Sequence, residues 1–208
     1  MSATINVPAS IIAAAAHAMA KKDIRYYLNG MMIEKSPHGG VRVVATNGHH
    51  LIAIRAIGAT IKQRVKAQYI IPRKTVEAIV KAGKSGGMVE FKISSNCSFS
   101  ARVGDTTFHG DLIDGKFADW ERAMPDDDSL TGPVEIAGHY IESVIKANAA
   151  LCKLEGQGVR YNGVTWHMRG EKAPAVAVFG QRIEGIHAIA VVMPVFNRNA
   201  ASFKETKV

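Results

Sequence analysis

The sequence predicts an α+β protein made of three copies of one βαβββ unit, with antiparallel sheets on one side and helices on the other. Two observations lead to this fold class. A pattern of one strand, one helix and three or four strands starts three times, and each copy ends with an apolar pair and a proline. The endings are Ile70-Ile71-Pro72, Ala123-Met124-Pro125 and Val192-Met193-Pro194. Because one such unit cannot cover its own sheet, we expect the units to stack into a longer sheet with their helices on one face.

The first unit extends to Pro72 and contains the clearest turn signal in the chain. We expect a strand at 3–7, then an Ala-rich helix at 8–21. The four strands expected after it are 25–33, 41–46, 51–56 and 68–71. Between the middle two of these, Asn47-Gly48 predicts a tight hairpin, since both residue types tolerate a positive φ.

The second unit begins at Arg73. An expected helix at 73–84 carries Val76, Ile79 and Val80 on one side and ends at a Ser-Gly-Gly sequence. Strands are expected at 88–93, 97–103 and 106–112. The first two units together predict one complete domain over residues 1–125, and the acidic, turn-rich stretch 126–133 predicts a linker.

The third unit predicts a half domain over residues 134–196. It should contain a strand at 134–137 and a helix at 138–153. The inward residues of this helix should be Ile141, Val144, Ile145 and Leu151. The strands expected after it are 158–161, 164–168, 175–179 and 185–192. Residues 197–208 are polar and predict a flexible tail.

The composition indicates a cytoplasmic protein with an anionic partner. The net charge of +8 favours a partner such as nucleic acid. Cys97 and Cys152 lie far apart, which predicts reduced thiols and no disulfide. The apolar run 11–20 has no Lys or Arg before it and is too short to span a bilayer, so we expect neither a signal peptide nor a membrane segment.

No motif in the chain predicts catalysis, a metal or a cofactor. The eight histidines show neither HxxxH nor HExxH spacing. His49 and His50 are neighbours in an expected hairpin, so their side chains should point to opposite faces. The glycine-rich stretch 83–87 ends a helix instead of starting one, unlike a phosphate-binding loop.

The three expected helices carry an excess of lysines on their outward positions. These lysines are Lys21, Lys74, Lys81, Lys84, Lys146 and Lys153, with Glu77 and Glu142 as the acidic residues. One interpretation is a solvated face with Glu77–Lys81 and Glu142–Lys146 pairs. The other is a surface that binds a phosphate backbone without sequence specificity.

Five segments of the chain resemble the bacterial DNA polymerase III β subunit, the sliding clamp family. The segments are 23–30, 45–51, 71–74, 114–120 and 191–194. Residues 1–125 resemble the complete middle domain of that family, and residues 131–195 resemble the last half of its final domain.

This resemblance implies a DNA clamp fold and a non-catalytic role as a processivity factor in DNA replication. In that family, two subunits close a ring of twelve units around duplex DNA and tether a polymerase. With three units per chain, the same ring would need a homo-oligomer of four chains. The implied partners are double-stranded DNA, DNA polymerase and clamp-loader peptides, without a cofactor. The resemblance also assigns DNA contact to the basic loop, giving the set Lys21, Lys22, Arg25, Lys74, Lys81, Lys84, Lys146 and Lys153. For the loop residues, the alternative is favourable placement of cations at a helix end.

The resemblance further implies a pocket for a short hydrophobic peptide. By motif, its residues are Leu28, Thr46, Gly48, His49, His50, Leu51, Ala118, Arg122, Ala123, Val191, Val192, Met193, Pro194, Val195 and Phe196. Several positions depart from the family: His50 stands where an arginine is usual, Ala118 replaces a proline, and Ala123 replaces a larger aliphatic residue. These changes predict a reshaped pocket, which would still bind an aliphatic–aromatic peptide through a few anchors.

Two other functions fit the same sequence. The chain could be a clamp-like decoy or adaptor that binds clamp partners without closing a ring. It could also be an unrelated basic, β-rich nucleic-acid binder. Retention on circular but not linear DNA would identify a closed ring, and peptide binding would separate the adaptor from the unrelated binder.

Overall fold

The structure is a computed structural model that describes residues 2–63, 68–83, 86–125, 134–152, 163–168, 170, 173–180 and 184–195. Its helices are α1 (Ala9–Ala16), α2 (Arg73–Ala82) and α3 (Gly138–Cys152), with single 3₁₀ turns η1 (Tyr26–Leu28) and η3 (Trp120–Ala123). The strands of the first unit are β1 (Ala3–Pro8), β2 (Gly30–Lys35), β3 (Val41–Thr46), β4 (His50–Ala56), β5 (Thr60–Gln63) and β6 (Gln68–Pro72). Those of the rest of the chain are β7 (Met88–Ile93), β8 (Ser98–Val103), β9 (Thr106–Asp111), β10 (Val164–His167), β11 (Ala175–Phe179) and β12 (Ile186–Val192).

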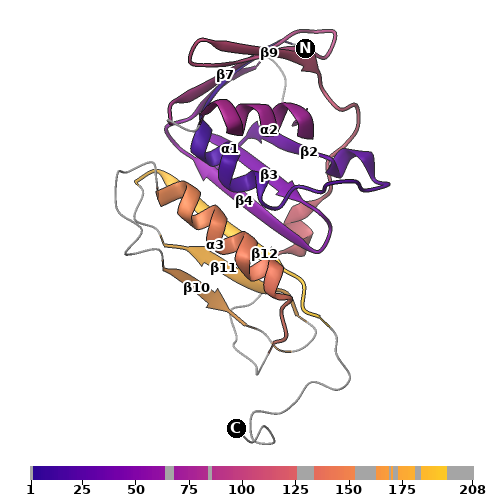
Figure 1. The fold of residues 1–208 in the computed structure, drawn as a ribbon, viewed down its shortest axis with the longest axis vertical. Helices are drawn as coiled ribbons and strands as arrows, with labels where there is room; N and C mark the ends of the chain where they lie inside the picture. The colour runs from indigo at the N-terminus through magenta and orange to yellow at the C-terminus, as the bar shows by residue number, and fades with distance from the viewer. Residues whose placement is uncertain are drawn as a thin grey trace, which may run out of the picture.

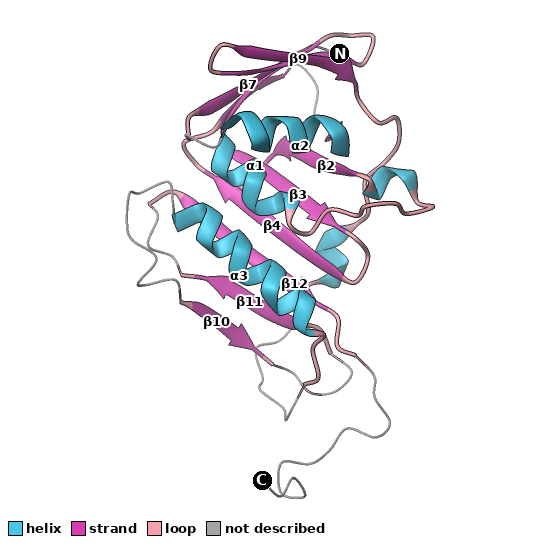
Figure 2. Cartoon of the chain, viewed as in Figure 1, coloured by secondary structure: helices cyan, strands magenta, loops and turns pink. Residues whose placement is uncertain are grey.

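Two antiparallel sheets form one layer, and the three helices lie together on one side of it (Figures 1 and 2). The order in one sheet is β5-β1-β7-β8-β9, and in the other β10-β11-β12-β4-β3-β2-β6. Helix α1 packs against both α2 and α3. The prediction of an α+β fold with stacked units and helices on one face is confirmed.

The first two units exchange a strand. β1 leaves the sheet of its own unit and pairs with β7, where Ile5 lies opposite Phe91. β6 closes the other sheet against β2, with Ile70 opposite Met32. Because β1 and β5 join the sheet of β7, β8 and β9 while β2, β3, β4 and β6 belong to the other sheet, the first unit contributes strands to both sheets and residues 3–111 form one interlocked body.

The third unit extends the sheet of the first. β12 pairs with β4 from Ile186 opposite Ala56 to Val192 opposite His50. The sheet therefore continues without interruption from residues 30–72 into residues 164–192. This pairing places α3 beside α1 on the helix side of the sheet.

Strands β2, β3 and β4 are buried on both faces, as expected for near-continuous apolar runs. Met31, Val43 and Ile52 belong to the core on the helix side. Their neighbours in the sequence belong to a second core on the outer side, which contains Met32, Val44, Leu51 and Ala53. Residues 113–124, which we call the strap, supply apolar side chains to this outer core.

Several elements differ from the sequence prediction. α1 ends at Ala16 instead of residue 21, and residues 26–28 form a 3₁₀ turn where a strand was expected. No strand forms at 134–137, and an unpredicted short strand, β5, pairs with β1. Ile145, expected to face inward, is 54% exposed, since the buried face of α3 follows Val144, Ala147, Asn148 and Leu151. The strand expected at 158–161 and the tail at 197–208 lie outside the described residues.

Candidate functional site

The hairpin between β3 and β4 has the expected tight turn. The Thr46 hydroxyl donates to the His50 carbonyl at 2.8 Å and accepts from the Gly48 amide at 3.0 Å. The Asn47 side-chain oxygen accepts from the His49 and His50 amides at 2.9 and 3.0 Å. Gly48 has φ +87°, and a Cβ there would lie 2.5 Å from Nη2 of Arg25. The positive φ favours glycine at this position, whereas the Arg25 guanidinium is the end of a flexible side chain that could move away from a Cβ.

The expected pocket residues divide between the two faces of the sheet. Leu51 and Val191 are opposite one another across β4 and β12, and both belong to the outer core with Ala118 and Ala123. We call Leu51, Ala118, Ala123, Val191 and the adjoining Met193 the outer patch.

His50 and Val192 are also cross-strand partners, but they face the helices. His50 and Val192 therefore lie on the opposite sheet face from Leu51, and their assignment to partner binding stays a prediction. The reason is the two-residue period of a strand, which places neighbours on opposite faces.

Met193 and the remaining expected pocket residues lie in η1, the hairpin, η3 and the segment after β12. His49, expected on the face opposite His50, instead lies near the same Tyr140 ring of α3, with 6.4 Å between the ring centres. Met193 is 41% exposed and its amide donates to the His49 carbonyl at 2.8 Å. Val195 is 39% exposed and its amide donates to the Glu135 carbonyl at 2.8 Å. Arg122 and His49 are exposed, Pro194 is half-buried, and Leu28 and Thr46 are buried. Phe196 lies outside the described residues.

His50 joins the hairpin to α1 and α3. Its Nδ1 lies 3.0 Å from the Asn47 side-chain oxygen and its Nε2 lies 3.0 Å from the Ser143 hydroxyl. Ser143 donates to the His17 carbonyl at 2.8 Å, and the His50 ring lies 4.6 Å from the Tyr140 ring. Burial lowers the pKa of His50 to about 4, with smaller contributions from the neighbouring His139 and His49. Burial also lowers the pKa of His17. His50 is thus held neutral at the junction of the two parts of the chain.

The expected basic residues that the structure describes are all exposed. Lys74 and Lys81 lie on α2, Lys146 on α3, and Lys21 and Lys22 follow α1. Lys84 and Lys153 lie outside the described residues.

Of the two expected helical ion pairs, Glu142–Lys146 forms at 2.6 Å. Glu77 pairs with Arg73 at 2.7 Å instead of with Lys81. Lys81 consequently makes no ion pair with a described residue, and the same holds for Lys21, Lys22 and Lys74.

Two residues fix the loop that carries Lys21 and Lys22. Arg73 donates to the carbonyls of Met19 and Ala20 at 3.0 and 2.7 Å. Arg25 forms an ion pair with Asp23 at 2.8 Å, and this guanidinium lowers the pKa of Asp23 to about 2. The charge of Arg25 is therefore already paired, whereas the two lysines are free to contact an anion.

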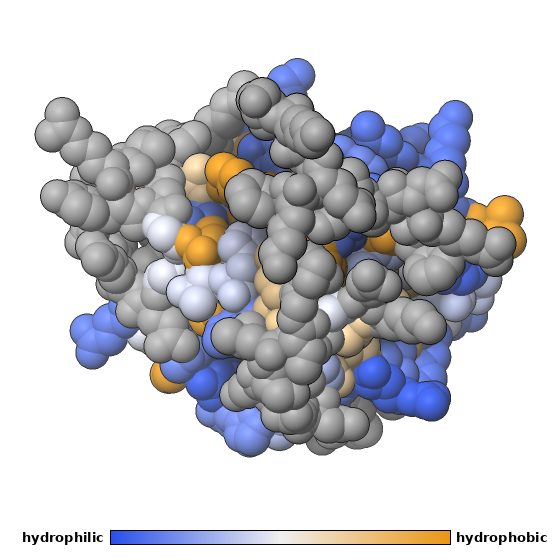
Figure 3. All heavy atoms as spheres, turned by 90° about the horizontal axis from the view of Figure 1, so that it is seen from below, coloured by the Kyte–Doolittle hydropathy of each residue, from blue (hydrophilic) through white to orange (hydrophobic). Residues whose placement is uncertain are grey.

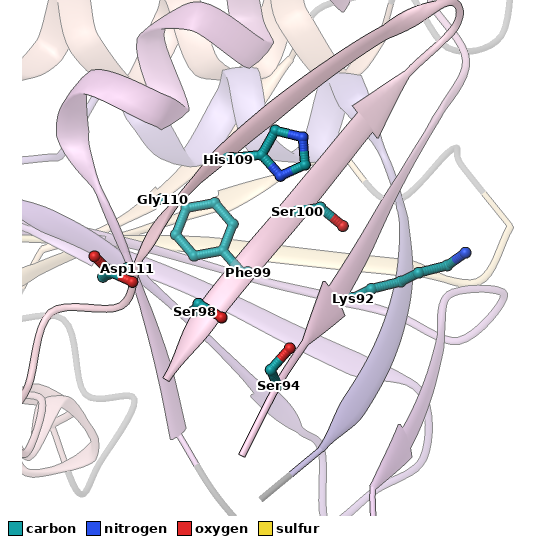
Figure 4. A pocket seen from close by; sticks show the side chains of 8 residues that line it. All are labelled: Lys92, Ser94, Ser98, Phe99, Ser100, His109, Gly110 and Asp111. Carbon is teal, nitrogen blue, oxygen red and sulfur yellow. The ribbon is translucent and has the colours of Figure 1, made fainter. Parts of the chain in front are cut away.

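Other surface features were not predicted from the sequence. A polar depression of about 530 Å³ lies on the outer face of the five-stranded sheet, lined by Lys92, Ser94, Ser98, Phe99, Ser100, His109, Gly110 and Asp111 (Figure 4). Exposed apolar side chains are separated by hydrophilic ones, as the view from below shows (Figure 3). Within the described ranges, no three His, Cys, Asp or Glu side chains are placed to hold a metal ion. The helices of the described part are too short or too polar to cross a membrane.

Comparison with known proteins places these features in a family context. The family described as "DNA polymerase III beta subunit, central domain" matches residues 4–119. The beta sliding clamp of Pseudomonas putida is 40% identical over 109 residues, covering 52% of this chain and 29% of that protein. The beta sliding clamp of Proteus mirabilis is 36% identical over 148 residues, covering 69% of this chain and 38% of that protein. The chain thus spans less than two fifths of the length of these relatives.

The fold matches solved structures over nearly its whole length. A crystal structure of the DNA polymerase sliding clamp from Pseudomonas aeruginosa with a ligand superposes with a TM-score of 0.71 at 21% identity. The match covers 93% of this chain and 67% of that one. The similarity therefore includes the third unit, which lies beyond the residues that the family description matches.

Proposed function

Because this chain belongs to the DNA polymerase III β-subunit family, we propose that it acts as a non-catalytic sliding clamp. It would bind or encircle duplex DNA without sequence specificity and tether a polymerase or another partner through the outer patch. The observation that carries the proposal is the uninterrupted pairing of β12 with β4, which aligns all three helices on one face. This role would place the protein in the cytoplasm, together with DNA.

The helix face supports the DNA-binding part of the proposal. Lys21, Lys22, Lys74 and Lys81 are exposed there and make no ion pair with described residues. Lysine is a compact point charge on a flexible stem, which suits contact with a phosphate backbone without reading bases. Such binding is electrostatic and falls with salt.

The outer patch supports the partner-binding part. Leu51, Ala123 and Val191 come from three separate segments and belong to one apolar core cluster, in which Leu51 and Val191 are buried, beside exposed Met193 and Arg122. An extended peptide with an aliphatic and an aromatic side chain would bind here through those anchors. Ala118 and Ala123 leave room for larger peptide side chains than bulkier residues would.

A closed ring of the family's twelve units would require four copies of this chain. Native mass spectrometry at high protein concentration tests this assembly, and a monomer under those conditions would exclude the ring. The chain covers at most 38% of the two relatives described, and the alternative function is that of an adaptor that binds clamp partners without closing a ring.

Retention on DNA tests the clamp directly. We expect the protein to stay on nicked circular DNA and to be lost after linearisation, because a closed ring slides off free ends. Equal loss from both DNA forms, combined with retained peptide binding, would favour the adaptor.

A matched pair of charge reversals tests the helix face. Lys74→Glu combined with Lys81→Glu should lower the slope of log affinity against log salt by about 2, since each phosphate contact contributes about 0.9. Lys92→Glu, on the outer face of the five-stranded sheet, should leave the slope unchanged. Equal effects of the two variants would contradict binding through the helix face.

A further inference from the structure

The last part of the strap is held on the outer sheet face by Arg42, whose side chain is 16% exposed. Arg42 of β3 donates from Nε to Glu34 of β2 at 2.8 Å, and its Nη2 also bonds the same carboxylate. Its Nη1 donates to Glu121 of η3 at 2.5 Å, and its guanidinium lies 4.8 Å from the centre of the Trp120 ring. One side chain therefore binds two strap residues and the sheet at the same time.

The buried carboxylate of Glu34 has hydrogen-bond partners for both of its oxygens. Side chains of Arg42 and Glu34 are only 16% and 6% exposed, and the second oxygen of Glu34 accepts from Gln68 at 3.2 Å. A planar guanidinium can bond a carboxylate, reach a second acid and stack on an indole simultaneously, which the ammonium of a lysine cannot do. The position therefore requires arginine and not only positive charge.

The rest of the strap is fixed independently of Arg42. At its start, the Ile113 amide donates to the Ile70 carbonyl at 2.9 Å. In its middle, Phe117 is 2% exposed and belongs to the outer core. Arg42 thus controls the last part, η3, in which Trp120 and Glu121 are directly followed by Arg122 and Ala123.

We propose that Arg42 is a positioning residue for partner binding, acting through Trp120 and Glu121. It sets the place of η3, and with it the distance between Ala123 and Arg122 on the strap and Val191 and Met193 on the other side of the outer patch. This inference rests on the proposed function of the outer patch. Arg42 itself need not touch the bound peptide.

The chain contains a matched control for this arrangement. Glu90 of β7 and Arg102 of β8 are also cross-strand partners on the outer face of a sheet. Their contact is 3.5 Å long, the side chains of Glu90 and Arg102 are 24% and 62% exposed, and Glu90 also pairs with Lys92 of its own strand at 3.4 Å. Replacing Arg102 changes the same kind of ion pair without affecting the strap.

The experiment uses Arg42→Lys and Glu121→Gln, with Arg102→Lys as the control, in a Trp166→Phe background where Trp120 is the single tryptophan. The probe is a fluorescein-labelled peptide with a Leu-Phe pair between polar residues. We expect Arg42→Lys to weaken peptide affinity about tenfold, the loss of one charge-assisted contact, and Glu121→Gln to weaken it less. Arg102→Lys should have no effect. Trp120 emission should shift to longer wavelength in Arg42→Lys only.

The outcomes separate the inference from the function on which it rests. If Arg42→Lys shifts Trp120 emission but leaves peptide affinity unchanged, Arg42 anchors the strap without positioning the patch, and the inference is overturned. If neither changes, the anchor itself is refuted. If the unaltered protein binds no peptide while the emission shift occurs, the proposed partner site fails and the structural anchor stands.

Discussion

The two sheets carry the same cross-strand ion pair under different conditions. Glu34 and Arg42 lie opposite each other in the seven-stranded sheet, and Glu90 and Arg102 do so in the five-stranded sheet. The first pair is buried beneath the strap, with an indole and a second carboxylate on the same guanidinium. The second is largely exposed at the rim of a polar face. We infer that the ion pair contributes to stability where the strap covers it, as at Glu34–Arg42, and contributes little where it is exposed, as at Glu90–Arg102.

The outward side chains of the strands also differ between the two sheets: they are apolar beneath the strap and polar where the sheet is exposed. Outward positions of β2, β3 and β4 include Met32, Val44 and Leu51, which need an apolar cover. Outward positions of β8 and β9 include Ser98, Ser100 and His109, which water can solvate. The strap covers the apolar sheet face, and the polar sheet face stays exposed to water.

The largest difference in stability between the covered and the exposed sheet face should come from truncating Phe117, the buried aromatic side chain of the strap. Phe117→Ala should lower the free energy of unfolding by about 4 kcal/mol, the usual cost of truncating a buried aromatic. Phe108→Ala on β9, where the side chain is only partly buried, should cost clearly less. Urea unfolding followed by circular dichroism measures both values. Equal costs would mean that the strap is not part of the cooperative core.

The next difference concerns the two arginines. Arg42→Met should destabilise by about 3 kcal/mol, because it leaves the Glu34 carboxylate buried without its partner. Arg102→Met should stay within about 0.5 kcal/mol, as is typical of an exposed pair. The same unfolding measurement compares them. A loss at Arg102 as large as that at Arg42 would contradict the role assigned to the cover.

A smaller difference is expected in how histidines on the two sheets affect the pH dependence of stability. His50 has its pKa lowered to about 4, so the unfolded chain, titrating near 6.5, binds the proton more readily than the folded protein. Stability should therefore fall by about 2 kcal/mol between pH 7 and pH 5, and the lowered pKa of His17 adds a loss of the same sign. His50→Gln should flatten this dependence, whereas His109→Gln, on the open face, should leave it intact. An unchanged pH profile in His50→Gln would show that the burial of His50 is not the source of this pH dependence.

Local patterns predicted much of the fold but not its long-range choices. Alternating and continuous apolar runs predicted the strands, and Asn47-Gly48 predicted the hairpin, because these signals depend on neighbouring residues. The pairing of Glu77 with Arg73 was not predicted, because both partners are four residues from Glu77 and the Glu-before-Lys order of Glu77–Lys81 is the one that a helix favours. Residues 26–28 have strand-forming side chains, but hydrogen bonds between Asp23 and Asn29 close a turn there.

The candidate site was predicted as a set of segments, not as a surface. The resemblance brought together residues 46–51, 118–123 and 191–195, and the structure does place these segments side by side. It could not assign a face to each side chain, so His50 and Val192 were grouped with Leu51. Arg42 was not identified, because an isolated arginine in a strand gives no local sign that a distant tryptophan will cover it.

The exchanged strand has a consequence for synthesis of the chain. The five-stranded sheet contains both β1 and β9, so it cannot be complete until residue 111 has left the ribosome. The first 72 residues, although they contain a full strand–helix–strand pattern, are therefore not an independent folding unit. Deleting residues 2–8 would remove β1 from the five-stranded sheet, which contains β7, β8 and β9 of the second unit. The seven-stranded sheet, which contains the other main strands of the first unit, would be less affected. The order of helices and strands shows the βαβββ unit twice in residues 1–125. We expect the smallest segment that folds to contain both of these units.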